Sequence, residues 1–80
     1  MRATVLVRPR QGILDPQGEA VQQSLRRLGF DVSSARVGRV IDLELAADGG
    51  EDARARVERM CTQLLANPLI ESFEIRVEES

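Results

Sequence analysis

The stretch Leu14-Asp15-Pro16-Gln17-Gly18 constrains the fold most, because it ends an apolar run and starts the first helix. Asp15 suits the N-cap, since its carboxylate can accept hydrogen bonds from the free N–H groups of the first turn. Pro16 fits the first helical position, where its missing N–H costs nothing. Glycine in that turn is unfavourable relative to alanine by roughly 0.5–1 kcal/mol. The stretch therefore predicts a strand-to-helix turn. Either another segment approaches Gly18 closely, or the helix tolerates the lower stability that glycine causes there.

Six segments alternate between strand-like and helix-like patterns, which sets the expected fold. Strand-like alternation covers residues 2–8, 31–37, 39–46 and 70–77, and helical apolar spacing covers 16–28 and a segment that ends near Ala66. The order β-α-β-β-α-β predicts a ferredoxin-like α+β fold, a two-layer sandwich with two helices on one face of a four-stranded antiparallel sheet. We expect a single domain over residues 1–80.

The turns between these segments carry their own predictions. Gly38 separates two strand-like segments and predicts a β-hairpin, with a longer continuous strand bent at Gly38 as the alternative. Asp48 and Glu51 match a capping box at the start of the second helix. Asn67-Pro68 is expected to end that helix.

Composition removes most catalytic chemistry from this chain. It has no His, Lys, Trp or Tyr, and all 11 of its basic residues are Arg. A histidine base and a Schiff-base lysine are therefore excluded. Cys61 is the only cysteine, so neither an internal disulfide nor a cysteine-cluster metal site can form. Cys61 lies among apolar helix residues and is predicted to be a buried small hydrophobe. We expect no catalytic residue, no metal site and no cofactor on this chain.

The sequence also limits the expected surroundings and partners. No apolar run approaches the ~20 residues of a membrane span, and the N-terminus lacks the apolar stretch of a signal peptide, so we expect a cytoplasmic protein without a membrane partner. RNA binding through the sheet would need stacked aromatics on central strands, but Phe30 and Phe73 fall elsewhere, so no nucleic acid is expected. A chain this small is a candidate homodimer or higher homo-oligomer. Its candidate surfaces are the outer strands and a bare sheet face with Leu6, Val32, Val40 and Ile70.

Charge and topology together predict a candidate binding surface at one end of the molecule. Residues 1–40 carry seven Arg and three acidic residues, whereas residues 41–80 carry four Arg and ten acidic residues. The expected strand order, 4-1-3-2, gathers the Asp15 cap, four arginines and Asn67-Pro68 at one edge. Such an edge can bind an anion or dock a protein, and the plainer interpretation is a helix cap with solvated arginines. The four arginines are Arg8, Arg10, Arg36 and Arg39.

Three blocks of sequence resemble a known family. They are Leu14-Asp15-Pro16-Gln17-Gly18-x-Ala20-Val21, Arg36-x-Gly38-Arg39, and Cys61-x-x-Leu64-Leu65-Ala66-Asn67-Pro68-x-Ile70-Glu71. Their order and spacing are similar to the PurS family, the small subunit of phosphoribosylformylglycinamidine synthase in purine biosynthesis. Where the family often carries Lys, this chain has Arg39, which keeps the charge and changes its geometry.

The resemblance implies a noncatalytic subunit that self-associates and bridges two larger subunits. PurL, the synthetase, would use ATP and magnesium to activate formylglycinamide ribonucleotide, and PurQ, the glutaminase, would release ammonia from glutamine. The small subunit would help to seat the glutaminase and protect ammonia transfer, and ATP and nucleotide binding would belong to the synthetase. The candidate partner-binding residues are those of the matched blocks: Asp15, Pro16, Gln17, Gly18, Arg36, Gly38, Arg39, Asn67 and Pro68.

Two other functions fit the residues less well. The first is a small-molecule-binding regulatory module similar to the ACT domains, which share this topology; a thermal shift with an amino acid or nucleotide would distinguish it. The second is a standalone enzyme that uses carboxylates or Cys61, which turnover by the isolated chain would reveal.

Overall fold

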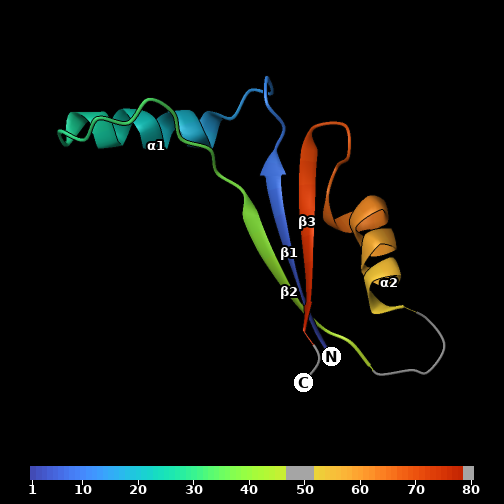
Figure 1. The fold of residues 1–80 in the computed structure, drawn as a ribbon. Helices are drawn as coiled ribbons and strands as arrows, with labels where there is room; N and C mark the ends of the chain where they lie inside the picture. The colour runs from blue at the N-terminus through green and yellow to red at the C-terminus, as the bar shows by residue number, and fades with distance from the viewer. Residues whose placement is uncertain (47–51, 79–80) are drawn as a thin grey trace.

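The computed structural model describes residues 1–46 and 52–78, and its elements follow the expected alternation in part (Figure 1). The described elements are β1 (Arg2–Pro9), α1 (Pro16–Arg27), β2 (Arg39–Glu44), α2 (Ala53–Met60), a π-helical turn η1 (Cys61–Leu65) and β3 (Glu71–Glu78).

The sheet is antiparallel and has the order β2-β1-β3. On the central strand, Val5 lies between Ile41 of β2 and Ile75 of β3. Alternation turns Val5 and Val7 to one face, where both are fully buried. The helix α2 packs against β3 and places Val57 in the same core. The α+β class is confirmed, and the arrangement is consistent with a ferredoxin-like fold.

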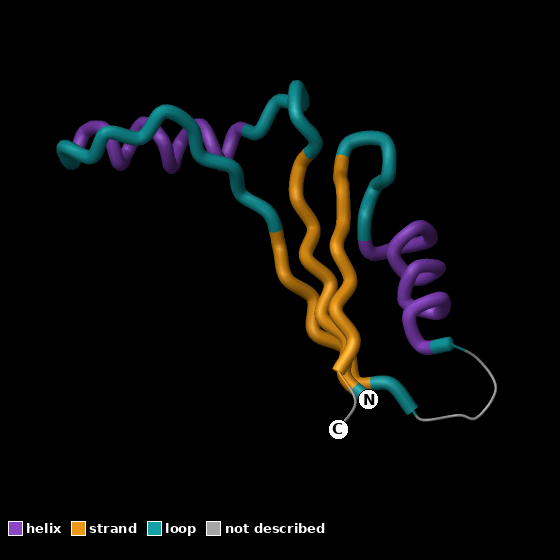
Figure 2. The backbone as a smooth tube through the Cα atoms, in the orientation of Figure 1, coloured by secondary structure: helices purple, strands orange, loops and turns teal. Residues whose placement is uncertain are grey.

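Within one chain, α1 differs from the ferredoxin-like expectation, because it projects away from the sheet instead of covering it (Figure 1). The chain measures 53 × 27 × 14 Å, with a radius of gyration of 16.1 Å. A compact chain of this length would have a radius of about 12 Å. Figure 2 shows the chain after α1 turning back and running beside the helix before it enters β2. We call this unit, residues 11–38, the arm.

The strand predicted over residues 31–37 and the hairpin at Gly38 are wrong. This segment bonds to α1, since the Gln22 amide donates to the Ser33 carbonyl (2.9 Å) and Arg26 donates to the Val32 carbonyl (2.9 Å). The chain then passes through Gly38 into β2 without reversing, which is closer to the alternative of one bent segment. A Cβ at Gly38 would lie 2.1 Å from the Val7 carbonyl oxygen, so glycine allows this close passage along β1.

The second helical segment ends near the predicted position but with a different last turn. The Ala66 N–H donates to the Cys61 carbonyl (3.0 Å), the five-residue spacing of a π turn. Leu64, in this wider turn, is 82% exposed. Asp52 caps α2 by accepting from the Arg54 N–H (3.1 Å). The capping box predicted at Asp48 and Glu51 lies outside the described residues.

The bare sheet face is less apolar than expected. Leu6 pairs with Val40 there, but Val32 lies in the arm and Ile70 precedes β3.

Over the described parts of the chain, no helix is long and apolar enough to cross a membrane. In the same ranges, no cluster of three or more Cys, Asp or Glu residues could hold a metal ion.

Candidate partner-binding site at the junction of arm and sheet

Asp15 ties the start of α1 to the returning chain. One carboxylate oxygen accepts from the Gly18 N–H (3.0 Å), the expected capping bond. The other oxygen accepts from the Val37 N–H (2.9 Å), which lies 22 residues further along the chain. These two donors hold the pKa of Asp15 below its usual range, with the Val37 bond as the larger cause.

Gly18 is required by a close approach, one of the two explanations that the sequence left open. It is the only buried residue of α1. A Cβ at Gly18 would lie 2.3 Å from the Ala35 carbonyl oxygen and 2.5 Å from the Asp15 carboxylate. The helix therefore packs directly on the backbone of Ala35. Pro16 and Gln17 are the first two residues of the helix.

Arg39 joins the start of β2 to the start of β3 and to the end of η1. Its guanidinium donates to both carboxylate oxygens of Glu71 (2.6 and 3.1 Å) and also to the Leu65 carbonyl. Glu71 in turn accepts from the Asn67 N–H (2.7 Å). The hydrogen bond from Arg39 and then the bond from the Asn67 N–H lower the pKa of Glu71, and the charge of Arg39 adds a smaller effect. The hydrogen bond to Glu71 raises the pKa of Arg39.

Two further arginines bond to backbone at this junction: Arg10, directly before the arm, bonds to the loop before β3, and Arg36 bonds the arm to the end of β1. The Arg10 N–H donates to the Ile70 carbonyl (2.9 Å), and its side chain donates to the Pro68 carbonyl (2.9 Å). The Arg36 guanidinium donates to the Pro9 carbonyl. The predicted gathering at one end of the molecule is therefore present for Arg10, Arg36, Arg39 and Asn67-Pro68. Arg8, the fourth arginine of that prediction, lies opposite Ser72 near the same end of β1. Their role in partner binding stays a prediction.

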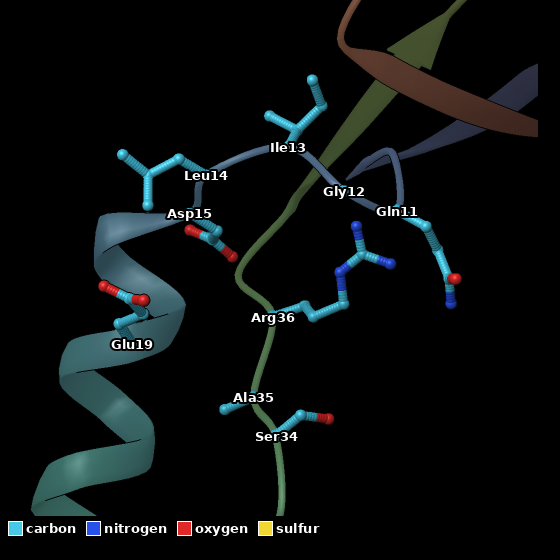
Figure 3. A pocket seen from close by; sticks show the side chains of 9 residues that line it. All are labelled: Gln11, Gly12, Ile13, Leu14, Asp15, Glu19, Ser34, Ala35 and Arg36. Atoms are coloured by element: carbon cyan, nitrogen blue, oxygen red, sulfur yellow. The ribbon is translucent and has the colours of Figure 1, made fainter.

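Two surface cavities flank this junction. The first, of about 500 Å³, lies between the β1–α1 loop and residues 34–36 (Figure 3). In Figure 3, Arg36 extends toward Gln11 and Gly12. The second cavity, of about 260 Å³, lies where the arm meets β2 and β3. Its lining includes Asp15, Gln17, Gly38, Arg39 and Glu71.

The second cavity has an apolar rim that the sequence argument missed. Ile13, Leu14 and Ile70 line it and are 38%, 74% and 42% exposed. The sequence places Leu14 at the end of an apolar run and at the head of the first matched block, but it is not among the candidate partner-binding residues. Leu14 lies directly before a helix cap and outside any strand, and this position could have indicated that its side chain is exposed. An apolar rim around charged groups is typical of a protein-docking surface.

Cys61 is buried, as predicted. Its side chain is fully buried in the core beside Val57. Burial, and to a lesser extent the charge of Glu58, raises the pKa of its thiol. Cys61 therefore stays protonated at neutral pH, which does not suit a nucleophile.

Residues 2–79 match the PurS family, described as phosphoribosylformylglycinamidine (FGAM) synthase. The chain belongs to the PurS family. The PurS subunit of FGAM synthase from Methanocaldococcus jannaschii is 38% identical over 79 residues, which cover 98% of this chain and 95% of that protein. Its crystal structure is described as a subunit of formylglycinamide ribonucleotide amidotransferase in the purine biosynthetic pathway.

Solved PurS structures have the same fold. Bacillus subtilis PurS superposes with a TM-score of 0.87 at 35% identity and covers 98% of both chains. A chain in the PurLQS structure from Thermotoga maritima superposes with a TM-score of 0.82 at 36% identity, over 94% of this chain and 93% of that one. This PurS-family chain therefore shares both the sequence pattern and the extended arrangement of its relatives.

Proposed function

We propose that this chain is a noncatalytic bridging subunit of phosphoribosylformylglycinamidine synthase. It links a PurL synthetase to a PurQ glutaminase and supports ammonia transfer between them. The complex converts formylglycinamide ribonucleotide, glutamine and ATP to the amidine, and the PurL subunit binds ATP and magnesium. The cytoplasmic location expected from the sequence belongs to the same proposal.

The junction of arm and sheet is the observation that carries this proposal. Three side chains form hydrogen bonds that fix the arm, the start of β2 and the chain before β3 in one arrangement. Asp15 bonds to the Val37 N–H, Arg10 to the Pro68 carbonyl and Arg39 to Glu71. Around them lie the exposed side chains of Ile13 and Leu14. A rigid polar base with an exposed apolar rim suits docking, because little ordering entropy is lost on binding.

The chemistry of the chain supports a role without catalysis. It has no histidine or lysine, and its one thiol is buried with a raised pKa. In the proposed mechanism, Arg36 and Arg39 hold the junction together. The Arg39 side chain is 48% exposed, and its exposed part can contact a carboxylate of a partner subunit.

Assembly with purified PurL and PurQ tests the docking surface. We expect the wild-type chain to co-elute with both subunits when ATP and glutamine are present. Leu14→Asp should weaken the complex at least about tenfold, since a carboxylate buried without a partner costs more than the 1.4 kcal/mol of a tenfold change. The matched control is Gln63→Asp, which adds the same charge at an exposed position of η1.

Two outcomes would contradict the proposal. The first is that the wild-type chain forms no complex with PurL and PurQ under any of these conditions. The second is that Leu14→Asp and Gln63→Asp assemble equally well, which would move the contact away from the junction. The ACT-like alternative predicts a thermal shift of the isolated chain with an amino acid or nucleotide.

A further inference from the structure

The cavity of about 500 Å³ beside the arm is lined by polar side chains that the junction does not use. Figure 3 shows Gln11, Ser34 and Arg36 extending to one side of the returning chain, whereas Asp15 and Glu19 lie on its other side. Within the described residues, neither the Gln11 amide nor the Ser34 hydroxyl has a hydrogen-bond partner. Side chains that can donate hydrogen bonds therefore surround one side of the cavity, away from the carboxylates.

The Arg36 guanidinium is held in place while most of its donors stay available. Its Nη2 donates to the carbonyl of Pro9 at the end of β1. A guanidinium has five N–H donors, and this bond uses one of them. Arg36 lowers the pKa of Asp15 only as a lesser cause, because the Asp15 oxygens accept from the N–H groups of Gly18 and Val37. Arg36 is therefore a fixed cation with free donors.

The loop that carries Gln11 is a tight turn. The Ile13 N–H donates to the Arg10 carbonyl (3.3 Å), and Gly12 has a φ of 84°, which fits the third position of a type II turn. Arg36 extends toward this turn in Figure 3. The turn and the Arg36 bond to the end of β1 thus keep the Gln11 amide and the guanidinium on the same side of the cavity.

The arginines beside this turn bond to neutral groups. The side chains of Arg10 and Arg36 donate to backbone carbonyls, whereas Arg39 is paired with the carboxylate of Glu71. A bond to a carbonyl fixes a guanidinium without neutralising its charge. The positive charges of Arg10 and Arg36 therefore favour an anion at the turn.

We propose that Arg36, Gln11 and Ser34 bind the phosphate group of a small phosphorylated molecule. A phosphate monoester has three oxygens that point in different directions and a charge of about −1.5 to −2 at pH 7, which suits donors from two separate segments. A carboxylate has only two oxygens, in one plane, and a single charge. In Figure 3, Ile13 and Leu14 of the proposed docking rim extend away from Arg36, so the phosphate site and the docking rim use different side chains.

NMR titration of the chain without PurL or PurQ tests this site independently of the bridging role. The probes are inorganic phosphate and ribose 5-phosphate, with acetate and sodium chloride as controls at matched ionic strength. We expect both phosphates to shift the amide signals of residues 11–12 and 34–36 with saturation in the millimolar range, and the controls to cause no saturable shift there. Ribose 5-phosphate has neither a base nor an amino group, so its binding differs from that of the amino acid or nucleotide expected for an ACT-like module. No saturable shift up to about 10 mM phosphate, or an equal response to acetate, would overturn the proposal.

A matched pair of variants locates the phosphate group. Gln11→Glu should weaken binding of ribose 5-phosphate at least about tenfold, because a carboxylate at hydrogen-bond range repels the phosphate. The Gln11 side chain is exposed and makes no hydrogen bond to the described chain, so the fold does not depend on it. Gln23→Glu is the control, since it adds the same charge at an exposed position of α1 outside the cavity. Equal affinity of the two variants would overturn the proposal.

Discussion

Asp15 joins two segments with one carboxylate, and only half of this was predictable. Its N-cap bond to Gly18 follows from local sequence, because Asp before Pro is a common start of a helix. Its bond to the Val37 N–H joins residues 22 positions apart, and no local pattern encodes such a pairing. For the same reason, the sequence indicated that Gly18 is unusual in a first turn but could not show that the Ala35 carbonyl lies against it.

Acid should weaken the junction through Asp15 and Glu71. Both have a lowered pKa in the folded chain, Asp15 through the N–H groups of Val37 and Gly18 and Glu71 through Arg39. Their stabilisation is complete above the unfolded values of about 4 and is lost as the pH falls through the lowered folded values. We expect the free energy of unfolding to be level from about pH 5 to 8 and to fall below about pH 4. Urea unfolding as a function of pH measures this. Asp15→Asn should flatten the acid decline, and an unchanged decline in that variant would contradict the account.

Gly18→Ala should destabilise the arm. The added Cβ would meet the Ala35 carbonyl at 2.3 Å, so helix and returning chain must separate, at a cost of about 1–3 kcal/mol. Chemical denaturation measures the free energy of unfolding. Ser24→Ala, an exposed position of the same helix, should change it by less than about 0.5 kcal/mol. If Gly18→Ala is as mild as Ser24→Ala, the close approach does not constrain the helix.

At the scale of elements, periodicity predicted β1, α1, β2, α2 and β3 within a few residues of their ends. The prediction failed at residues 31–37, where alternation was present but the segment runs beside α1 and pairs with none of the described strands. Their hydrogen bonds go to Gln22, Arg26 and Asp15 instead. Strand-like sequence thus predicts an extended segment, whereas strand formation depends on a partner.

The link from β2 to the start of β3 and the end of η1 should depend on the geometry of Arg39. Arg39→Lys keeps the charge but loses the two-oxygen contact with Glu71 and the bond to Leu65. Because the Arg39 side chain is 48% exposed, we expect a loss of no more than about 1 kcal/mol, or up to about 5 °C in Tm. The control is Arg76→Lys, whose contact with Glu74 is a single one at 3.2 Å between more exposed groups. A fall in Tm for Arg39→Lys no larger than for Arg76→Lys would contradict this role.

At the scale of the whole molecule, the sequence could not show that one chain covers only part of its own sheet. The β-α-β-β-α-β order alone does not show whether α1 covers its own sheet or projects from it. The observed position depends on contacts such as the Arg36 bond to the Pro9 carbonyl and the Asp15 bond to the Val37 N–H, and bonds to backbone groups carry no sequence signal. The gathering of the candidate residues at one end was predicted from the four-stranded order 4-1-3-2, and the observed order β2-β1-β3 agrees with it for the three strands that form.

The most direct test of the bridging role is amidine formation by PurL plus PurQ with and without this chain, driven first by glutamine and then by ammonia. The bridging proposal predicts that the glutamine-driven reaction depends strongly on the chain and that the ammonia-driven reaction depends on it much less, because a bridging subunit would couple two sites and perform no chemical step. Equal rates with and without the chain in both reactions would contradict the account.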